Sequence, residues 1–125
     1  MNWEEMEIFK GIDLNDSFVL SWRQEPNEVI FELEASIWPA SEYYEEPKKD
    51  EYTCYKSACL SIKNAKEIKG LKEMNKVKPA TDAAGEKDYG NIDALQKSSN
   101  GFYIEGEFGH VSIIGGEIHF EIKEI

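Results

Sequence analysis

The stretch from Phe102 to Lys123, FYIEGEFGHVSIIGGEIHFEIK, constrains the fold of this chain more than any other segment. Apolar and polar residues alternate along it, which is typical of β-strands with one buried face, because successive side chains on a strand point to opposite faces. Gly115-Gly116 interrupts the alternation and predicts a hairpin with a loop of about two residues, since primed turns need the positive φ that glycine adopts readily. In that hairpin Ile114 pairs with Glu117. The predicted buried face carries five apolar residues, namely Val111, Ile113, Ile118, Phe120 and Ile122.

Similar alternation recurs earlier in the chain and predicts further antiparallel strands. Asn100-Gly101 is a hairpin signal that joins the C-terminal meander to a strand over 92–99. The buried sides of three other predicted strands are Phe18, Leu20 and Trp22; Val29, Phe31, Leu33, Ala35 and Ile37; and Tyr52, Cys54, Ala58, Leu60 and Ile62, with Lys56 as a misfit. We therefore expect one mainly β domain over residues 1–125, an antiparallel sandwich or partly open barrel with at most short helical segments.

Three segments lack a clean period. Residues 1–10 form either a short helix or a first strand; Trp3, Met6 and Phe9 recur there at helical spacing and are expected to cap the core. The lysine-rich segment 63–78 has an apolar residue at every third position, which favours a short strand near 65–68 followed by a loop. The acidic segment 81–93 does not match the ligand spacing of a calcium loop, so we interpret it as an ordinary loop.

The net charge of −11 limits the partners that the chain can bind. A polyanion is repelled by nucleic acid and by anionic membranes, so neither is an expected partner. The charge is compatible with a basic protein partner, or with solubility alone. The N-terminus lacks the pattern of a signal peptide and no apolar run approaches the length of a membrane span, which predicts a cytoplasmic protein. Cys54 and Cys59 should face opposite sides of one strand and remain free thiols.

The segment from Trp38 to Glu51, WPASEYYEEPKKDE, combines aromatic and acidic residues without periodicity and is predicted to be an exposed loop. Long loops in compact domains are often functional, and tyrosine and tryptophan commonly anchor interfaces. Alternatively, the aromatic side chains fold back over the edge of the sheet. The candidate partner-binding residues in this loop are Trp38, Glu42, Tyr43, Tyr44, Glu45 and Glu46.

A second candidate site follows from the predicted C-terminal hairpin. Its polar face would place His110 across from Glu121, with His119 diagonally nearby, and such a cluster could act as a general base or bind a metal. A solvated cross-strand pair explains the same residues. The sequence contains no phosphate-binding glycine loop, dinucleotide fingerprint or zinc-ligand spacing, so we expect no catalytic residues, metal or cofactor.

Its size, acidity, aromatic and acidic loop and lack of catalytic motifs make the chain resemble the immunity proteins of bacterial toxin systems. The segments GEFGHVSI (106–113) and DYGNID (88–93) are similar to stretches found in small uncharacterised bacterial proteins of that kind. The resemblance implies a non-catalytic protein whose acidic surface masks a basic toxin, often a nuclease. Two other functions stay open: a small enzyme or metal-binding protein that uses His110, His119 and Glu121, and a structural domain that self-associates through an exposed edge strand. Oligomeric state is not predicted.

Overall fold

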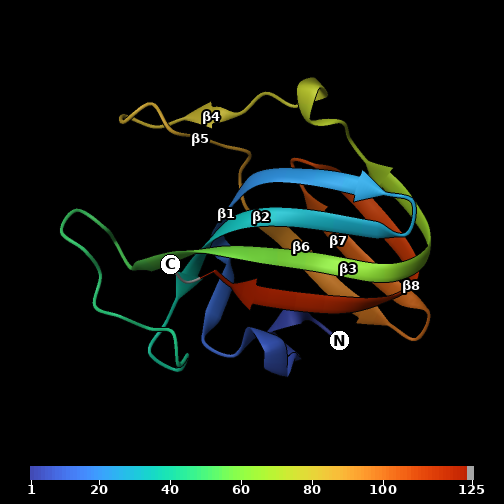
Figure 1. The fold of residues 1–125 in the computed structure, drawn as a ribbon, viewed down its shortest axis with the longest axis horizontal. Coiled ribbons are helices and arrows are strands. Elements are labelled where there is room, and N and C mark those ends of the chain that lie inside the picture. The colour runs from blue at the N-terminus through green and yellow to red at the C-terminus, as the bar shows by residue number, and fades with distance from the viewer. Residues whose placement is uncertain (124–125) are drawn as a thin grey trace.

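The computed structural model describes residues 1–123 and consists almost entirely of antiparallel β-strands, as Figure 1 shows. Six strands form one sheet in the order β1-β2-β3-β8-β7-β6, and β4 pairs with β5 in a small separate sheet. The strands are β1 (Ile12–Glu25), β2 (Glu28–Ile37), β3 (Cys54–Leu71), β4 (Ala80–Thr81), β5 (Lys87–Asp88), β6 (Ile92–Ser98), β7 (Gly101–Gly106) and β8 (Gly109–Ile122). The short 3-10 helices are η1 (Trp3–Glu5), η2 (Glu7–Phe9) and η3 (Met74–Lys76). The predicted mainly β fold is therefore confirmed.

The large sheet curls over itself into a half-barrel because β3 and β8 bend. In Figure 1, β1, β2, the first part of β3 and the end of β8 form the near layer, and β6 and β7 form the far layer. β3 and β8 pair with each other from Ala58↔Ile122 to Leu71↔Gly109, so both strands run through the two layers. Apolar side chains from both layers meet in one core, in which Phe31, Leu60 and Phe108 are fully buried.

The predicted hairpin at Gly115-Gly116 is wrong, because these glycines lie in the middle of the single strand β8. Their φ angles of 72° and 96° are left-handed, as a primed turn would require, but they bend the strand and do not reverse it. Asn64, with φ of 59°, lies in β3 beside this bend, where the register of the pair shifts. β8 changes phase at this bend, so Val111 and Ile118, which are an odd number of positions apart, both face the core. The extra residue of the neighbouring bulge lies on β3, between Ala65 and Glu67.

The alternation of apolar and polar residues predicted the buried side chains of β2 better than those of β1. Every residue of β2 that was predicted to face inward is buried. In β1 the prediction is wrong for Phe18, which is half-buried, and for Leu20, which is 36% exposed, whereas Val19 is fully buried. The register shifts between Val19 and Ser21, so Leu20 is the extra residue of a bulge and Trp22 is still buried.

In β3, Cys54, Ala58, Leu60 and Ile62 are buried as predicted, but Tyr52 precedes the strand and is 81% exposed. The strand also continues to Leu71, so the predicted short strand and loop after Lys63 are wrong. β8 supplies the reason, because it provides hydrogen-bonding partners along this whole length.

Two other predictions, for the hairpin before β7 and for the N-terminal residues, are confirmed. Ser98 pairs with Gly101 in the hairpin between β6 and β7, which confirms the Asn100-Gly101 signal. Trp3, Met6 and Phe9 are buried in η1, η2 and the residue between them, and so they cap the core as expected.

Candidate interaction site

The segment between β2 and β3, which we call the 38–51 loop, is held against the N-terminal segment at its start. The Trp38 amide donates to the carbonyl of Gly11 at 2.8 Å, and the Ser41 amide donates to the carbonyl of Trp38 at 2.9 Å. Gly11 has a φ of 74°, and a Cβ there would lie 2.3 Å from the Ser41 nitrogen, so the two segments touch backbone to backbone. The start of the loop is thus fixed beside the residues that precede β1.

The six predicted partner-binding residues divide into two groups. Glu42, Glu45 and Glu46 are exposed, and Trp38 is 42% exposed, with its indole Nε1 donating to Ser36 Oγ at 3.1 Å. Tyr43 and Tyr44 are half-buried and pack against the core, as the alternative interpretation of the loop expected. Among these six residues, the three acids and the tryptophan are therefore the accessible ones.

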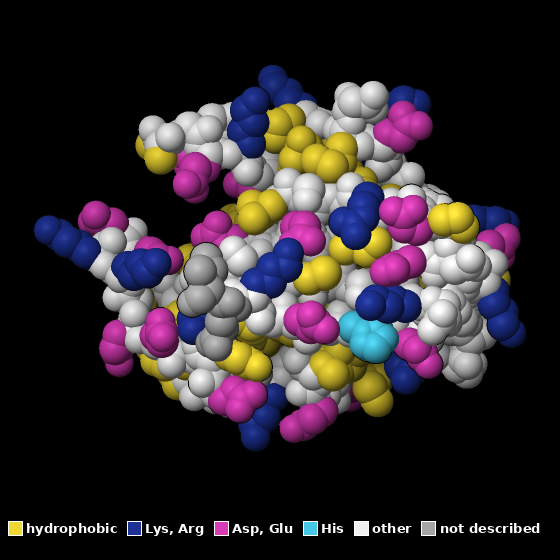
Figure 2. Space-filling model, viewed as in Figure 1, with side chains coloured by type: hydrophobic (Ala, Val, Ile, Leu, Met, Phe, Trp, Pro, Cys, Tyr) yellow, Lys and Arg dark blue, Asp and Glu magenta, His cyan; other side chains and the backbone are white. Residues whose placement is uncertain are grey.

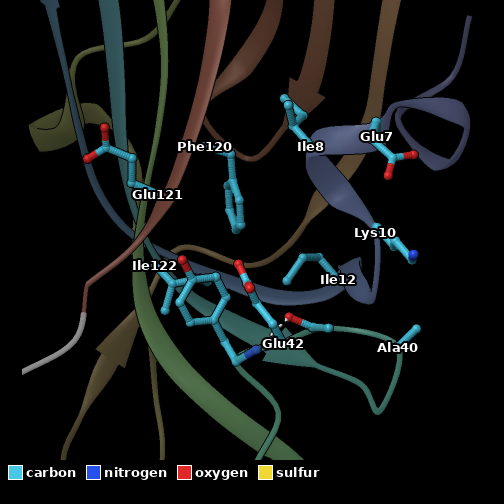
Figure 3. Close-up of a pocket in the computed structure, with 11 residues that line it drawn as sticks. Glu7, Ile8, Lys10, Ile12, Ala40, Glu42, Phe120, Glu121 and Ile122 are labelled. Atoms are coloured by element: carbon cyan, nitrogen blue, oxygen red, sulfur yellow. Dashed lines mark hydrogen bonds between the residues drawn. The ribbon is translucent and has the colours of Figure 1, made fainter.

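A cavity of 550 Å³, which we call the loop cavity, lies between the loop, η2 and the end of β8. Figure 3 shows Phe120 pointing into it, and the Glu42 carboxylate extends toward its middle. The Phe120 ring also packs against Phe9, with ring centroids 5.2 Å apart. The apolar lining consists of Ile8, Ile12, Ala40, Tyr43, Phe120 and Ile122, and the charged lining consists of Glu7, Lys10, Glu42 and Glu121. The cavity is thus lined by both apolar and acidic side chains.

A second cavity of 780 Å³, the N-terminal cavity, shares Glu7, Lys10 and Ile12 with the first. It is also lined by Glu4, Glu5, Asp13 and Trp38. Six carboxylates and one lysine thus line the two cavities together. In the described part of the chain, no ion pair joins Glu7, Glu42, Glu121 or Lys10 to another residue. The two cavities therefore carry a net negative charge, and Glu7, Glu42 and Glu121 have no ion-pair partner among residues 1–123.

The cavities bring together some of the predicted residues and add others. Glu42 and Tyr43 line the loop cavity and Trp38 lines the N-terminal cavity. Tyr44, Glu45 and Glu46 line neither, and Glu45 lies 3.7 Å from the Nζ of Lys56, the misfit of the β3 pattern. Sequence reasoning missed Ile8 and Phe120. Ile8 is apolar but does not belong to the three-residue spacing of Trp3, Met6 and Phe9, and this departure could have marked it as a residue outside the core.

Charged side chains of both signs cover the face that Figure 2 presents. Acidic and basic side chains are mixed around the loop at the left, along the lower edge and over the strands. On that mixed face the Lys123 Nζ donates to Glu32 Oε2. Burial, followed by Glu32, raises the pKa of the Cys59 thiol beneath them. A thiol with a raised pKa stays protonated at neutral pH and is a poor nucleophile.

The cluster of His110, His119 and Glu121 does not form, because it depended on the hairpin. On the continuous β8, His119 pairs with Ser61 and Glu121 with Cys59, both on β3, whereas His110 lies beyond the bend and pairs with Glu105 on β7.

Around His110, the Tyr103 hydroxyl donates to Glu105 Oε1 at 2.6 Å and lies 2.9 Å from His110 Nδ1. The bond to Glu105 raises the pKa of Tyr103, which keeps this phenol protonated. Within residues 1–123, no group of three or more histidine, cysteine, aspartate or glutamate side chains is placed to hold a metal ion.

Comparison with known proteins returns no relatives: no family model matches the chain, and neither curated proteins nor solved structures give a match. None of the helices in the described residues has the length and apolar character needed to cross a bilayer.

Proposed function

We propose that this chain is a non-catalytic acidic domain that binds a basic protein partner through the 38–51 loop and the two cavities beside it. The loop cavity is the observation that carries this proposal. Its apolar side chains offer area for burial, and its unpaired carboxylates complement a cationic partner. A cluster of like charges also speeds association with an oppositely charged protein.

The resemblance to immunity proteins gives the most specific form of this function. In that form, the chain masks the basic surface of a toxin such as a nuclease in the cytoplasm of the cell that makes it. A bound acidic domain would block the surface that a nuclease uses for its polyanionic substrate. The metal or enzyme function has lost its basis, since His110 and Glu121 lie on different parts of β8 and pair with different strands.

Affinity capture from the source cells tests the proposal. A tagged wild-type chain should retain a protein of basic isoelectric point at low salt and lose it as salt increases. Trp38→Ala should weaken the interaction by about 1–2 kcal/mol, because exposed aromatic anchors contribute most at interfaces. The measurement is a titration of the chain with the purified partner.

A charge-matched pair of variants controls for net charge. Glu42→Lys with Glu46→Lys changes the loop, and Glu86→Lys with Glu107→Lys makes the same change in net charge at exposed positions that line neither cavity. The first variant should release the partner and the second should retain it. Equal loss in both would show that only overall charge matters, and capture of no basic protein by the wild type would contradict the function.

A further inference from the structure

The second half of β8 has a strand neighbour on one side only. β8 pairs with β3 along its whole length, but it pairs with β7 only between Gly109 and Ile114. Within residues 1–123, no strand pairs with the other side of residues 116–122, and Figure 1 shows the arrowhead half of β8 at the lower border of the near layer. We call this side the free edge of β8.

The backbone groups that point to the free edge can be assigned. The Lys123 amide donates to the Ser57 carbonyl on β3 at 2.8 Å. Because hydrogen-bonding groups alternate between the two sides of an antiparallel strand, the amides and carbonyls of Ile118, Phe120 and Ile122 point away from β3. No residue of the described chain provides these backbone groups with a hydrogen bond.

The two outermost strands of the sheet are less open. On β1, Val19 exchanges two hydrogen bonds of 2.8 Å with Tyr89 and Gly90. On β6, the Lys97 amide donates to the carbonyl of Met1 at 2.7 Å. Segments of the chain thus cover part of the outer edges of β1 and β6, whereas no described segment pairs with the free edge of β8.

The free edge borders the loop cavity. Phe120 and Ile122 belong to the edge and also line the cavity, opposite Ile8, which is 42% exposed. A strand that paired with this edge would direct alternate side chains toward the apolar residues that line the cavity. Its other side chains would lie on the face where Glu117, His119 and Glu121 are exposed. An incoming strand should therefore alternate apolar with basic residues.

We propose that the free edge of β8 binds an extended segment of the basic partner as an added antiparallel or parallel strand. The main chain would supply the hydrogen bonds, apolar residues would fill the loop cavity, and basic residues would meet Glu117 and Glu121. A second copy of the chain is a weaker candidate, because two molecules that each carry a charge of −11 repel each other. This inference rests on the proposed function and gives it a binding mode.

Synthetic peptides test the mode of binding. The probe is a short peptide that alternates arginine and valine, and its control has the same sequence with N-methyl groups on the backbone nitrogens that would donate to the edge. The control keeps charge and side chains but cannot donate those bonds. In an NMR titration, the first peptide should shift the amides of Ile118, Phe120 and Ile122 and slow their exchange with solvent. The control should bind at least about tenfold more weakly, as expected for the loss of a few hydrogen bonds.

Each result decides one point. Equal binding of both peptides, or shifts spread over the whole acidic surface, would overturn strand addition. If neither peptide binds while the basic partner is still captured, strand addition fails and the proposed function stands. Protection of the same amides that rises with protein concentration, together with a dimeric mass in sedimentation, would assign the edge to a second copy and overturn the proposal.

Discussion

The two halves of β8 have similar sequences but different surroundings. Gly109–Ile114 lies between β3 and β7, and its inward residues Val111 and Ile113 are buried. Beyond Gly116, the strand has β3 alone as a strand neighbour, and the inward residues Ile118 and Phe120 are half-buried. Alternation of apolar and polar residues thus encodes which face is inward, but it does not encode how many neighbours a strand has. The half with fewer neighbours is the half that can receive a partner.

Truncation of matched isoleucines should show the largest contrast between the halves. Ile113→Ala removes a buried side chain and should lower the free energy of unfolding by about 2–5 kcal/mol. Ile118→Ala removes a half-buried one and should cost roughly 1–2 kcal/mol. Urea denaturation of both variants measures the difference. Equal losses would mean that the second half is as tightly packed as the first.

The bend between the halves should be sensitive to a methyl group. A Cβ at Gly116 would lie 2.7 Å from Cγ2 of Ile62 at a φ of 96°, so Gly116→Ala should destabilise the fold by about 1–3 kcal/mol. Gly85, in the loop between β4 and β5, has a similar φ of 85° with nothing within 4 Å of the added Cβ, so Gly85→Ala carries the backbone strain alone. Thermal unfolding of the two variants separates the clash from the strain. A Gly116→Ala protein as stable as Gly85→Ala would show that the bend relaxes around the methyl group.

The smallest effect is expected at the end of the second half, where Lys123 bonds Glu32. This hydrogen bond raises the pKa of Lys123 above its ordinary value of 10.5. A raised pKa in the fold means that the contribution to stability is complete below 10.5 and is lost as pH rises through the folded value. Wild type should therefore lose slightly more stability than Lys123→Met between neutral and strongly alkaline pH. The difference should shrink at high salt, because the pair is exposed. If the free energies of unfolding of wild type and Lys123→Met fell in parallel as pH rose, the pair would make no contribution to stability.

The sequence predicted the fold class because alternation is a local signal that each strand carries. It failed at Gly115-Gly116 because left-handed φ angles serve both a primed turn and a bend in a strand that continues. The difference depends on whether a distant strand continues alongside, and residues 64–71 of β3 do so. The prediction that Leu20 is buried failed for a related reason, since one bulge residue exchanges the two faces of the strand that follows.

The candidate site was predictable in part. The acids of the 38–51 loop are exposed, as their composition suggested, and Glu42 lies at a cavity. The facing wall could not be predicted, because η2 and the end of β8 are separated by almost the whole chain and meet only through the curl of the sheet. The histidine cluster depended on one pairing assumption, and it disappeared with that assumption.

The position of β3 has a consequence for synthesis. It lies in the middle of the sheet, yet one of its two neighbours, β8, leaves the ribosome after all the other described strands. Until then, a nascent chain presents an 18-residue strand with one side unpaired and with Leu60 and Ile62 uncovered. Such edges recruit other strands, so the growing polypeptide is most prone to aggregate before β8 has emerged, when a holdase chaperone would protect it most.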